Sequence, residues 1–441
     1  MRYGILQRSW LLLLRFVLGR GEVRAQEDRF FHREGWRGSY IDSRISSYMP
    51  QLRMYVIVRI DCWGSAYHKH MRNYFFQALA PKLLLLFIAF IVAAASYGGF
   101  FQKWEFRDGT TYSAPTMFDG TAKRPFVYRQ LLPSMANLIE YVTPDHISQK
   151  FEHWLAANPL KHNLIYRYFP NAKDSVASTY SLRYYALYGL SFASLFLAIF
   201  ALRALCQAHN PDLPAATLAA LTFALLLPLM LTEGGYFYDM PELLFMALAV
   251  LLAMRGQLLW LVIVTALATY NKESFLFFVL TLYPFLRARY TLRNTIWIEL
   301  GLLAIAAIIN LAVKLHYAGN IGEPVESQLM EHLLWLLKPS SYFAFEVNYG
   351  IPTTKGFNIV HFALLAILVH NGWRYLAPTV RQHFWIALVI NVPLFLAFCY
   401  EGELRNLSML YMTLVILMSI NISQCLQRYS GHANQIPSSG Q

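Results

Sequence analysis

Long apolar segments recur along this chain, and they limit it to folds that can lie in a lipid bilayer. A helix needs about 20 mostly apolar residues to cross the hydrocarbon core of a membrane. The sequence is 56% hydrophobic and only 14% charged, whereas soluble globular domains carry about 25% charged residues. We therefore expect an all-α, polytopic membrane protein of about ten transmembrane helices, with amphipathic helices in large external loops. The expected segments are Lys82–Phe101, Arg183–Cys206, Pro214–Leu231, Met240–Met254, Gln257–Tyr270, Ser274–Phe285, Thr295–Leu315, Phe357–His370, His383–Tyr400 and Leu407–Cys425.

Two of these segments, Gln257–Tyr270 and Ser274–Phe285, are too short to cross a bilayer as ordinary spans. They are joined by the polar residues Asn271-Lys272-Glu273, and we interpret them as two short helices that meet at a polar apex. Backbone that turns at membrane depth is tolerated only where it is buried in protein or lines a water-filled cavity. We expect the apex to border a cavity.

The two ends of the chain differ from the apolar middle. Residues 1–70 are rich in arginine and lack a sustained apolar period, so we expect a disordered N-terminal extension. Residues 71–428 form the expected transmembrane domain, with large external loops at 101–182 and 316–356. We expect a disordered C-terminal tail over residues 429–441.

Positive charge is unevenly distributed over the short loops. If every segment crosses, most loop arginines fall on one side, and the opposite short loops carry only Lys272 and Arg405. The positive-inside rule places the arginine-rich side in the cytoplasm. The unusual polar clusters then all fall on the outer face, where we expect them to share one external site. These clusters are Glu105–Arg129, Glu233–Glu242, Asn271–Ser274, His316–Lys355 and Glu401–Arg405.

The net charge of +12 suits arginine and lysine in cytoplasmic loops next to anionic lipid. The cations are scattered and form no nucleic-acid-binding motif, so we expect membrane lipids and no nucleic acid as partners. The four cysteines lie far apart in the sequence, without zinc or redox spacing. Nucleotide-binding and haem motifs are also absent from the sequence, and we expect no cofactor; a divalent metal has no support in these patterns.

The stretch Thr232–Glu242 concentrates acids between two apolar runs that are nearly free of charge. Ionisable groups at a membrane edge are costly and usually mark a functional site. A polar turn built on Gly234-Gly235 is the alternative interpretation. A turn does not require two tyrosines and two acids beside a helix start, so we favour a functional site. Its candidate residues are Tyr236, Tyr238, Asp239 and Glu242.

The first large loop carries a second group of candidates. Asp108 and Asp119 each precede a glycine, which is typical of a turn, and the cations that follow them are interleaved with aromatic residues. A solvated surface loop is the alternative, but basic and aromatic residues together suit a helix at the membrane interface. We expect two further interfacial helices, at Phe151–Ala157 and Leu329–Leu337, the latter with His332 on its surface. The candidate ligand-binding residues of this loop are Arg124, Tyr128 and Arg129.

Two helix junctions complete the set of candidates. Neighbouring side chains on a helix do not face each other, so Lys272 and Glu273 should have separate partners. At the second junction Arg405 could bind phosphate through two hydrogen bonds, near Glu401 and Glu403. The alternative is that Glu403 and Arg405 are ordinary interfacial anchors.

Carboxylates and cations together suggest a chemistry for this outward-facing site. A carboxylate of Asp108, Asp119, Asp239 or Glu242 could act as a general base toward a hydroxyl or amine. The cations Arg124, Arg129, Lys272 and Arg405 could stabilise a phosphate leaving group. A nucleotide sugar is cytoplasmic, so a phosphate reached from outside is expected to be attached to a lipid.

From Lys82 to about Cys425 the chain resembles the GT-C superfamily of integral-membrane glycosyltransferases, which use polyprenyl-phosphate-linked sugars. The resemblance rests on acids soon after the first span, amphipathic helices in external loops, and paired short helices with a Lys-Glu apex. The stretches Arg124–Arg129, Tyr236–Asp239 and Asn271–Glu273 also look like those of bacterial multispan proteins placed near this group. The tight Asp-x-Asp or Asp-Glu pair that is common in such loops is absent.

The resemblance implies a glycosyltransferase of the bacterial inner membrane, with its active site facing the periplasm. It implies that an aspartate of the first external loop, Asp108 or Asp119, is the catalytic base; Asp239 is a third candidate. The expected partners are a polyprenyl-phosphate-linked sugar and a glycan, lipid or protein acceptor. An O-antigen-type polymerase and a transporter or flippase for lipid-linked glycans are the alternatives. A transporter should show charges near span centres and two halves with matching broken helices, and the sequence shows one broken pair.

Overall fold

The computed structural model describes residues 79–433, except 177–178, 231–234, 326 and 349. The chain divides into two compact units, Met1–Ile88 and Ala89–Gln441, and the second unit holds nearly all described residues. The expected extension over residues 1–70 lies outside the described part, as does Glu233. The helix α19 (Tyr411–Ala433) extends over the first residues of the segment for which a disordered tail is expected. Residues 434–441 lie outside the described part.

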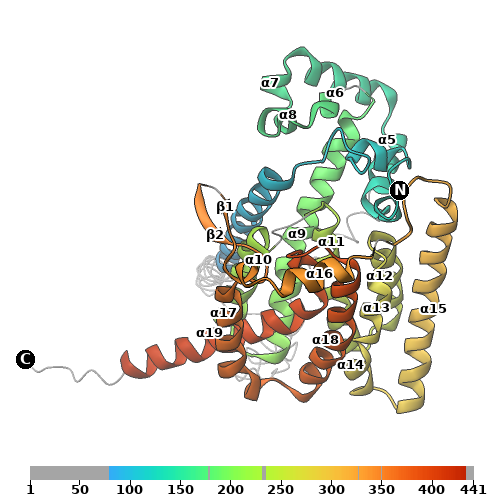
Figure 1. The fold of residues 1–441 in the computed structure, drawn as a ribbon. Coiled ribbons are helices and arrows are strands. Elements are labelled where there is room, and N and C mark those ends of the chain that lie inside the picture. Colours follow the sequence, from blue (N-terminus) through green and yellow to red (C-terminus); the bar gives the residue numbers. More distant parts are fainter. Residues whose placement is uncertain (1–78, 177–178, 231–234, 326, 349, 434–441) are drawn as a thin grey trace, which may run out of the picture. The chain divides into compact units, whose positions relative to one another are not determined.

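The described residues are mostly helical, and five of their helices are long and apolar enough to cross a membrane. This agrees with the expected all-α membrane protein (Figure 1). The other expected spans correspond to shorter apolar helices, because proline, glycine or polar residues interrupt them. The five long helices are Leu79–Trp104, α9 (Ser181–His209), α15 (Leu292–His316), α18 (Pro378–Phe398) and Leu404–Tyr429, which combines η5 (Leu404–Leu410) with most of α19. The shorter helices are α10 (Leu213–Met230), α11 (Asp239–Arg255), α12 (Leu258–Asn271), α13 (Phe275–Leu280), α14 (Tyr283–Arg287) and α17 (Ile359–Gly372).

The centre of the bundle is formed by α9, α10, α11 and α19. The helix α9 packs against α10 and α11, and α10 packs against α19. The buried side of α10 consists largely of small residues, which let neighbouring helices approach closely where lipid gives no hydrophobic driving force. Five alanines of this side are buried: Ala215, Ala216, Ala219, Ala220 and Ala224.

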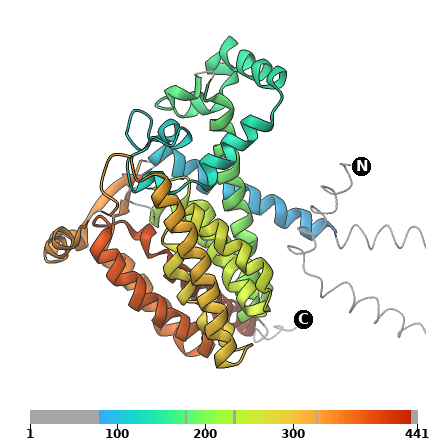
Figure 2. The same cartoon turned by 90° about the vertical axis from the view of Figure 1, so that its right-hand side faces the viewer.

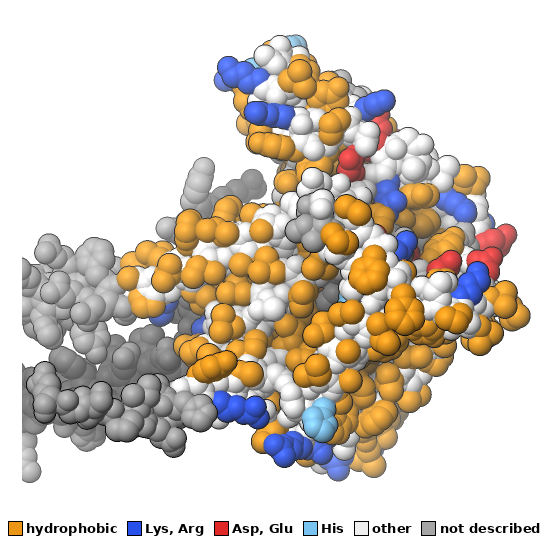
Figure 3. Space-filling view, turned by 60° about the vertical axis from the view of Figure 1, so that its left-hand side comes forward, with side chains coloured by type: hydrophobic (Ala, Val, Ile, Leu, Met, Phe, Trp, Pro, Cys, Tyr) orange, Lys and Arg blue, Asp and Glu red, His pale blue; other side chains and the backbone are white. Residues whose placement is uncertain are grey.

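The outer surface of the bundle is apolar. On α15, large side chains such as Leu300, Ile308 and Leu311 are about half to two thirds exposed, at 49%, 67% and 59%. Figure 3 shows hydrophobic side chains over much of one face, with lysine and arginine gathered along its lower edge. An apolar surface of this extent is unfavourable in water and suits contact with lipid.

The first large loop folds into a group of short helices between residues 105 and 180. Ser113 caps α4, and Asn158 and Asn163 cap α7 and α8 through their side-chain oxygens. The expected amphipathic segment Phe151–Ala157 forms the second half of α6. The short helices of this loop are the blue-green ones in Figure 2. The elements are α4 (Ala114–Phe118), η1 (Phe126–Tyr128), α5 (Leu131–Val142), α6 (Asp145–Ala157), α7 (Pro159–His162), α8 (Leu164–Tyr168) and η2 (Lys173–Val176).

The second large loop contains a short helix and a hairpin. The helix α16 (Leu329–Leu336) matches the expected amphipathic piece, but His332 is fully buried and not on its surface. The apolar side of α16 packs against α18, and His332 Nδ1 lies 3.2 Å from the carbonyl oxygen of Cys399. After η3 (Pro339–Phe343), strands β1 (Phe345–Asn348) and β2 (Ile351–Thr354) pair antiparallel, with Phe345 opposite Thr354. The turn η4 (Trp373–Tyr375) joins α17 to α18.

A glycine, Gly235, permits close packing where the chain enters α11. A Cβ atom on Gly235 would lie 2.6 Å from Trp104 Cδ1 and 2.7 Å from Phe100 Cε2. Gly235→Ala should therefore destabilise the protein by about 1–3 kcal/mol, because the rings must move in a packed region. The measurement is the midpoint of thermal unfolding in detergent. Gly189→Ala in α9 is the matched control, since its Cβ would meet nothing within 4 Å; an equal loss in both variants would contradict this account.

Candidate functional site

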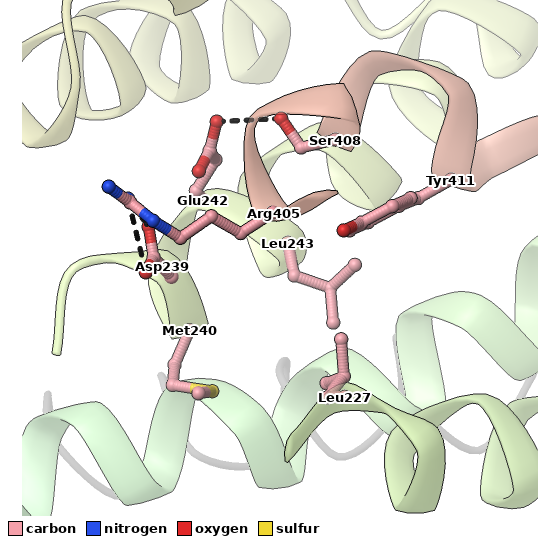
Figure 4. A pocket seen from close by; sticks show the side chains of 8 residues that line it. All are labelled: Leu227, Asp239, Met240, Glu242, Leu243, Arg405, Ser408 and Tyr411. Atoms are coloured by element: carbon pink, nitrogen blue, oxygen red, sulfur yellow. Dashed lines mark hydrogen bonds and ion pairs between the residues drawn. The ribbon is translucent and has the colours of Figure 1, made fainter. Parts of the chain in front are cut away.

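A network of buried ion pairs joins three segments that are distant in sequence. The segments are the first turn of α11, the polar apex after α12, and the chain entering η5. Lys272 Nζ lies 2.7 Å from Glu242 Oε2 and 3.4 Å from Asp239 Oδ1. Arg405 Nη1 lies 3.2 Å from Asp239 Oδ1, as Figure 4 shows, and its Nη2 lies 3.3 Å from Glu403 Oε1. All five side chains are buried.

Hydrogen bonds from neutral groups complete this ion-pair network. Ser408 Oγ donates to Glu242 Oε1 at 2.9 Å (Figure 4), and Asn406 Nδ2 donates to Glu403 Oε2 at 2.8 Å. The backbone N–H of Tyr236 donates to Asp239 Oδ2 at 2.8 Å, which fixes the carboxylate at the start of α11. Acids are favoured in the first turn of a helix because its free N–H groups carry partial positive charge.

A second ion pair lies beside the network. Arg129 binds Glu273 through two parallel contacts, with Nη2 at 2.9 Å from Oε1 and Nε at 3.3 Å from Oε2. Arg129 also donates to the hydroxyl of Tyr238. Lys272 and Glu273 thus have separate partners, which confirms the expectation for adjacent residues at the apex.

The space within the ion-pair network is small. A cavity of about 10 Å³ is lined by Asp239, Glu242, Arg405 and Ser408 together with apolar groups and Tyr411. A volume of this size holds about one water molecule. The carboxylates around Lys272 and Arg405 already compensate their charges, so a phosphate could bind them only by displacing these partners.

A larger cavity opens at the end of the helix Leu79–Trp104. Its volume is about 490 Å³, and charged groups of both signs form its walls. Lysine and tryptophan at the end of an apolar helix are typical of the membrane–water interface. The lining residues are Lys103, Trp104, Glu105, Arg107, Asp108, Gly109, Asn171, Lys173 and Asp174.

Asp108 is held in the wall of this cavity. The hydroxyl of Tyr184 donates to Asp108 Oδ1 at 2.5 Å, and the backbone N–H of Asp174 lies 3.4 Å from Oδ2. Burial raises the pKa of Asp108 to about 6, and the hydrogen bond from Tyr184 offsets only part of this rise. The neighbouring residues Glu105 and Arg107 have φ angles of 49° and 61°, in the left-handed region where strained backbone often accompanies function.

Stacked tyrosines connect the cavity with the ion-pair network. The rings of Tyr236 and Tyr238 are parallel, with centroids 5.0 Å apart. The guanidinium carbons of Arg107 and Arg405 lie 5.1 Å and 5.0 Å from the centroid of Tyr236. Tyr236 therefore lies between Arg107 of the larger cavity and Arg405 of the ion-pair network, and both tyrosines make cation–π contacts.

The remaining candidate residues line neither cavity. Asp119 has a side chain that is 40% exposed, and it accepts a hydrogen bond from Tyr180 at 2.5 Å and lies 3.4 Å from Arg183. The backbone of Arg124 bonds Ile321 at 2.9 Å, which ties the two large loops together. Tyr128 is buried beneath Lys314, and Glu401 is partly exposed in the turn before η5.

The structure adds residues that the sequence interpretation did not assign to a site. The most informative are Arg107, Asn171, Lys173, Asp174 and Tyr184, which surround Asp108. A dense charge cluster directly after the helix ending at Trp104 could have indicated the first of them. Residues 171–174 lie near Asp108 because of the path of the whole loop, so no local sequence pattern indicates their position.

Comparison of the chain with protein-family models, with curated proteins and with solved structures found no match. Among the described residues, no group of three or more histidine, cysteine or acidic side chains could hold a metal ion. The site assignments therefore depend on the geometry given above.

Removal of one cation should show how much the ion-pair network stabilises the fold. Lys272→Met should lower the free energy of unfolding by about 3–5 kcal/mol, because it leaves two buried carboxylates short of a positive charge. Equilibrium unfolding in mixed detergent micelles measures this change. The double variant Lys272→Met with Glu242→Gln should recover part of the loss.

Lys150→Met on the exposed side of α6 is the matched control and should change stability by no more than about 0.5 kcal/mol. If Lys272→Met is as mild as this control, the network does not hold the three segments together.

Proposed function

We propose that this chain is a membrane-embedded glycosyltransferase related to the GT-C superfamily, with about ten spans. It would transfer a sugar from a polyprenyl-phosphate donor to a glycan, lipid or protein acceptor at the outer face of a bacterial inner membrane. The observation that carries this proposal is the position of Asp108 in the wall of the 490 Å³ cavity at the end of an apolar helix.

Among the three candidate aspartates, Asp108 suits the role of general base best. A base works well when its pKa lies near the working pH, and burial raises the pKa of Asp108 to about 6. Asp119 contacts Tyr180 and Arg183 outside both cavities, and Asp239 is enclosed between Lys272 and Arg405. Only Asp108 of these three lines the larger cavity.

The depth and charge of the cavity support a lipid-linked donor. Lys103 and Trp104 end the helix Leu79–Trp104, and both line the cavity. A cavity at the end of a span lies at the level of lipid headgroups, where a phosphate on a lipid chain is also located. The cations Arg107 and Lys173 can bind the phosphate and stabilise it as a leaving group, whereas Lys103 is already paired with Glu346 at 2.5 Å.

In the proposed reaction, the Asp108 carboxylate accepts the proton of an acceptor hydroxyl or amine. The acceptor oxygen or nitrogen forms a bond to the anomeric carbon, and the bond from that carbon to the phosphate oxygen breaks. The lipid phosphate leaves with the electron pair of the broken bond. The hydroxyl of Tyr184 holds the carboxylate in place through its 2.5 Å hydrogen bond.

Asp108→Asn should lower the rate of sugar transfer by about 10²–10⁴-fold, because the amide cannot accept the proton. The test uses proteoliposomes and radiolabelled polyprenyl-phosphate sugars. Asparagine still accepts the hydrogen bond from Tyr184, so the fold should persist. Asp119→Asn is the matched control and should retain most activity. Loss in Asp119→Asn with an active Asp108→Asn would assign the base to Asp119 and contradict the proposal.

The rate of transfer should also depend on pH in a defined direction. Because burial raises the pKa of Asp108 to about 6, the carboxylate forms as pH rises through this value. kcat/KM should therefore increase about tenfold per pH unit below pH 6 and reach a plateau above it. A profile that stays flat across this range would exclude Asp108 as a base with this pKa.

A transporter or flippase of lipid-linked glycans is the second candidate function. It is favoured by the buried ion-pair network, since charges within the membrane region often mark transport pathways. The same proteoliposomes separate the two functions. Movement of a lipid-linked glycan across the membrane without a new glycosidic bond would favour the transporter, whereas a new bond favours the transferase or the related O-antigen-type polymerase.

A further inference from the structure

Three polar atoms around the larger cavity lack hydrogen-bond partners among the described residues. They are Nε and Nη2 of Arg107 and Oε2 of Glu105, and all three are shielded from solvent. Buried polar groups in folded proteins are nearly always paired, so each exception calls for an explanation. Both residues line the cavity, and a ligand there reaches these shielded atoms once the side chains around them move.

The two nitrogens of Arg107 that lack hydrogen-bond partners form one edge of its guanidinium group. Nε and Nη2 point in the same direction and can donate two parallel hydrogen bonds to a pair of oxygens. Arg129 uses this same edge, because its Nε and Nη2 bind the two oxygens of Glu273 at 3.3 Å and 2.9 Å. The corresponding edge of Arg107 fits two oxygens of an anion.

Aromatic rings hold Arg107 in this orientation. Its guanidinium carbon lies 4.8 Å from the centroid of Trp104 and 5.1 Å from that of Tyr236. Cation–π contacts use the flat face of the group, so the in-plane N–H donors remain for another ligand. Lys173 in the same cavity adds positive charge, which favours a phosphate over a singly charged carboxylate.

Glu105 has an unpaired acceptor, whereas Arg107 has unpaired donors. Its Oε1 accepts a hydrogen bond from Asn171 Nδ2 at 3.3 Å, and Oε2 is an acceptor in need of a donor. Glu105 and Arg107 are two residues apart and have opposite charges, yet they do not pair with each other. Their backbone is fixed by bonds from Glu105 N to Phe101 O at 3.0 Å and from Thr110 N to Arg107 O at 3.2 Å.

We propose that the cavity binds a phosphate ester of a sugar, with the Nε and Nη2 edge of Arg107 on the phosphate and Glu105 Oε2 on a sugar hydroxyl. A sugar phosphate offers both an oxygen pair for Arg107 and hydroxyl donors for Glu105. The biological meaning of this site rests on the proposed function, but the site itself is tested by binding alone. The phosphate-binding role then belongs to Arg107 and not to Arg405 or Lys272.

Titration calorimetry with the full chain in lipid nanodiscs tests this assignment. The probes are inorganic phosphate, three hexose 1-phosphates (glucose, mannose and galactose) and a short-chain polyprenyl-phosphate hexose. Arg107→Lys should weaken binding of every phosphate probe at least tenfold, because a lysine cannot donate two parallel bonds. Glu105→Gln should weaken binding of the best hexose phosphate about tenfold, and it should leave inorganic phosphate unchanged or more tightly bound.

Arg167→Ala is the matched control, because Arg167 also stacks on an aromatic ring, at 5.6 Å from Tyr168, and does not line the cavity. It should leave all affinities unchanged. Equal effects of Arg107→Lys and Arg167→Ala, or wild-type protein that binds none of the probes, would overturn the proposal. Circular dichroism and the unfolding midpoint identify a variant that fails to fold; Arg107→Gln then replaces it in the same comparison.

The probes also distinguish the source of the phosphate. Tighter binding of the polyprenyl-phosphate hexose identifies a lipid headgroup, and tighter binding of a hexose 1-phosphate identifies a soluble ester; either result supports the shared chemistry. If a soluble ester binds and no sugar is transferred from any lipid donor, the proposed function fails while this inference stands.

Discussion

The buried charges of Asp239, Lys272 and Arg405 impose the strictest condition on this structure. Transfer of a charge from water into a protein interior costs several kcal/mol per ion, and only close partners offset that cost. Each of these residues comes from a different segment, and each contacts at least one of the others. The start of α11, the apex after α12 and the entry to η5 must therefore meet at one point.

A chain of contacts leads from the ion-pair network to the larger cavity. Asp239 fixes the start of α11, and the two residues before it carry the chain back to Tyr236, whose ring contacts both Arg405 and Arg107. Gly235 then packs directly against Trp104 at the end of the long apolar helix. The ion-pair network is thus connected to the larger cavity through Tyr236 and Gly235, which contact Arg107 and Trp104 in the cavity lining.

The sequence predicts the helices well because their signal is local. The boundaries expected for Thr295–Leu315 lie within α15, and the interrupted pair around Lys272 appears as α12 followed by α13 and α14. Separate partners for Lys272 and Glu273 also follow from helix geometry alone. The burial of His332 could not be predicted, because it depends on a contact with the distant residue Cys399.

The site could be predicted only in part. The sequence indicates the acids and cations of the ion-pair network as unusual, but part of their pairing joins residues that are distant in the chain, such as Asp239 and Arg405, which are 166 positions apart. The sequence places Glu105 and Arg107 in an outer polar cluster, but their individual roles depend on left-handed backbone at residues that are not glycine. The charge cluster after Trp104 indicates the region, but no local pattern identifies its left-handed backbone, since tertiary contacts impose it.

Hydrogen–deuterium exchange with and without a polyprenyl-phosphate sugar tests the central claim most directly. If the larger cavity is the binding site and the ion-pair network is its support, the donor should slow exchange in peptides that cover residues 103–110 and 171–176. Peptides from the first turn of α11 and from η5 should change little. Protection of α11 and η5 together with unchanged exchange around Arg107 and Asp108 would contradict this account. The binding site would then be assigned to the ion-pair network.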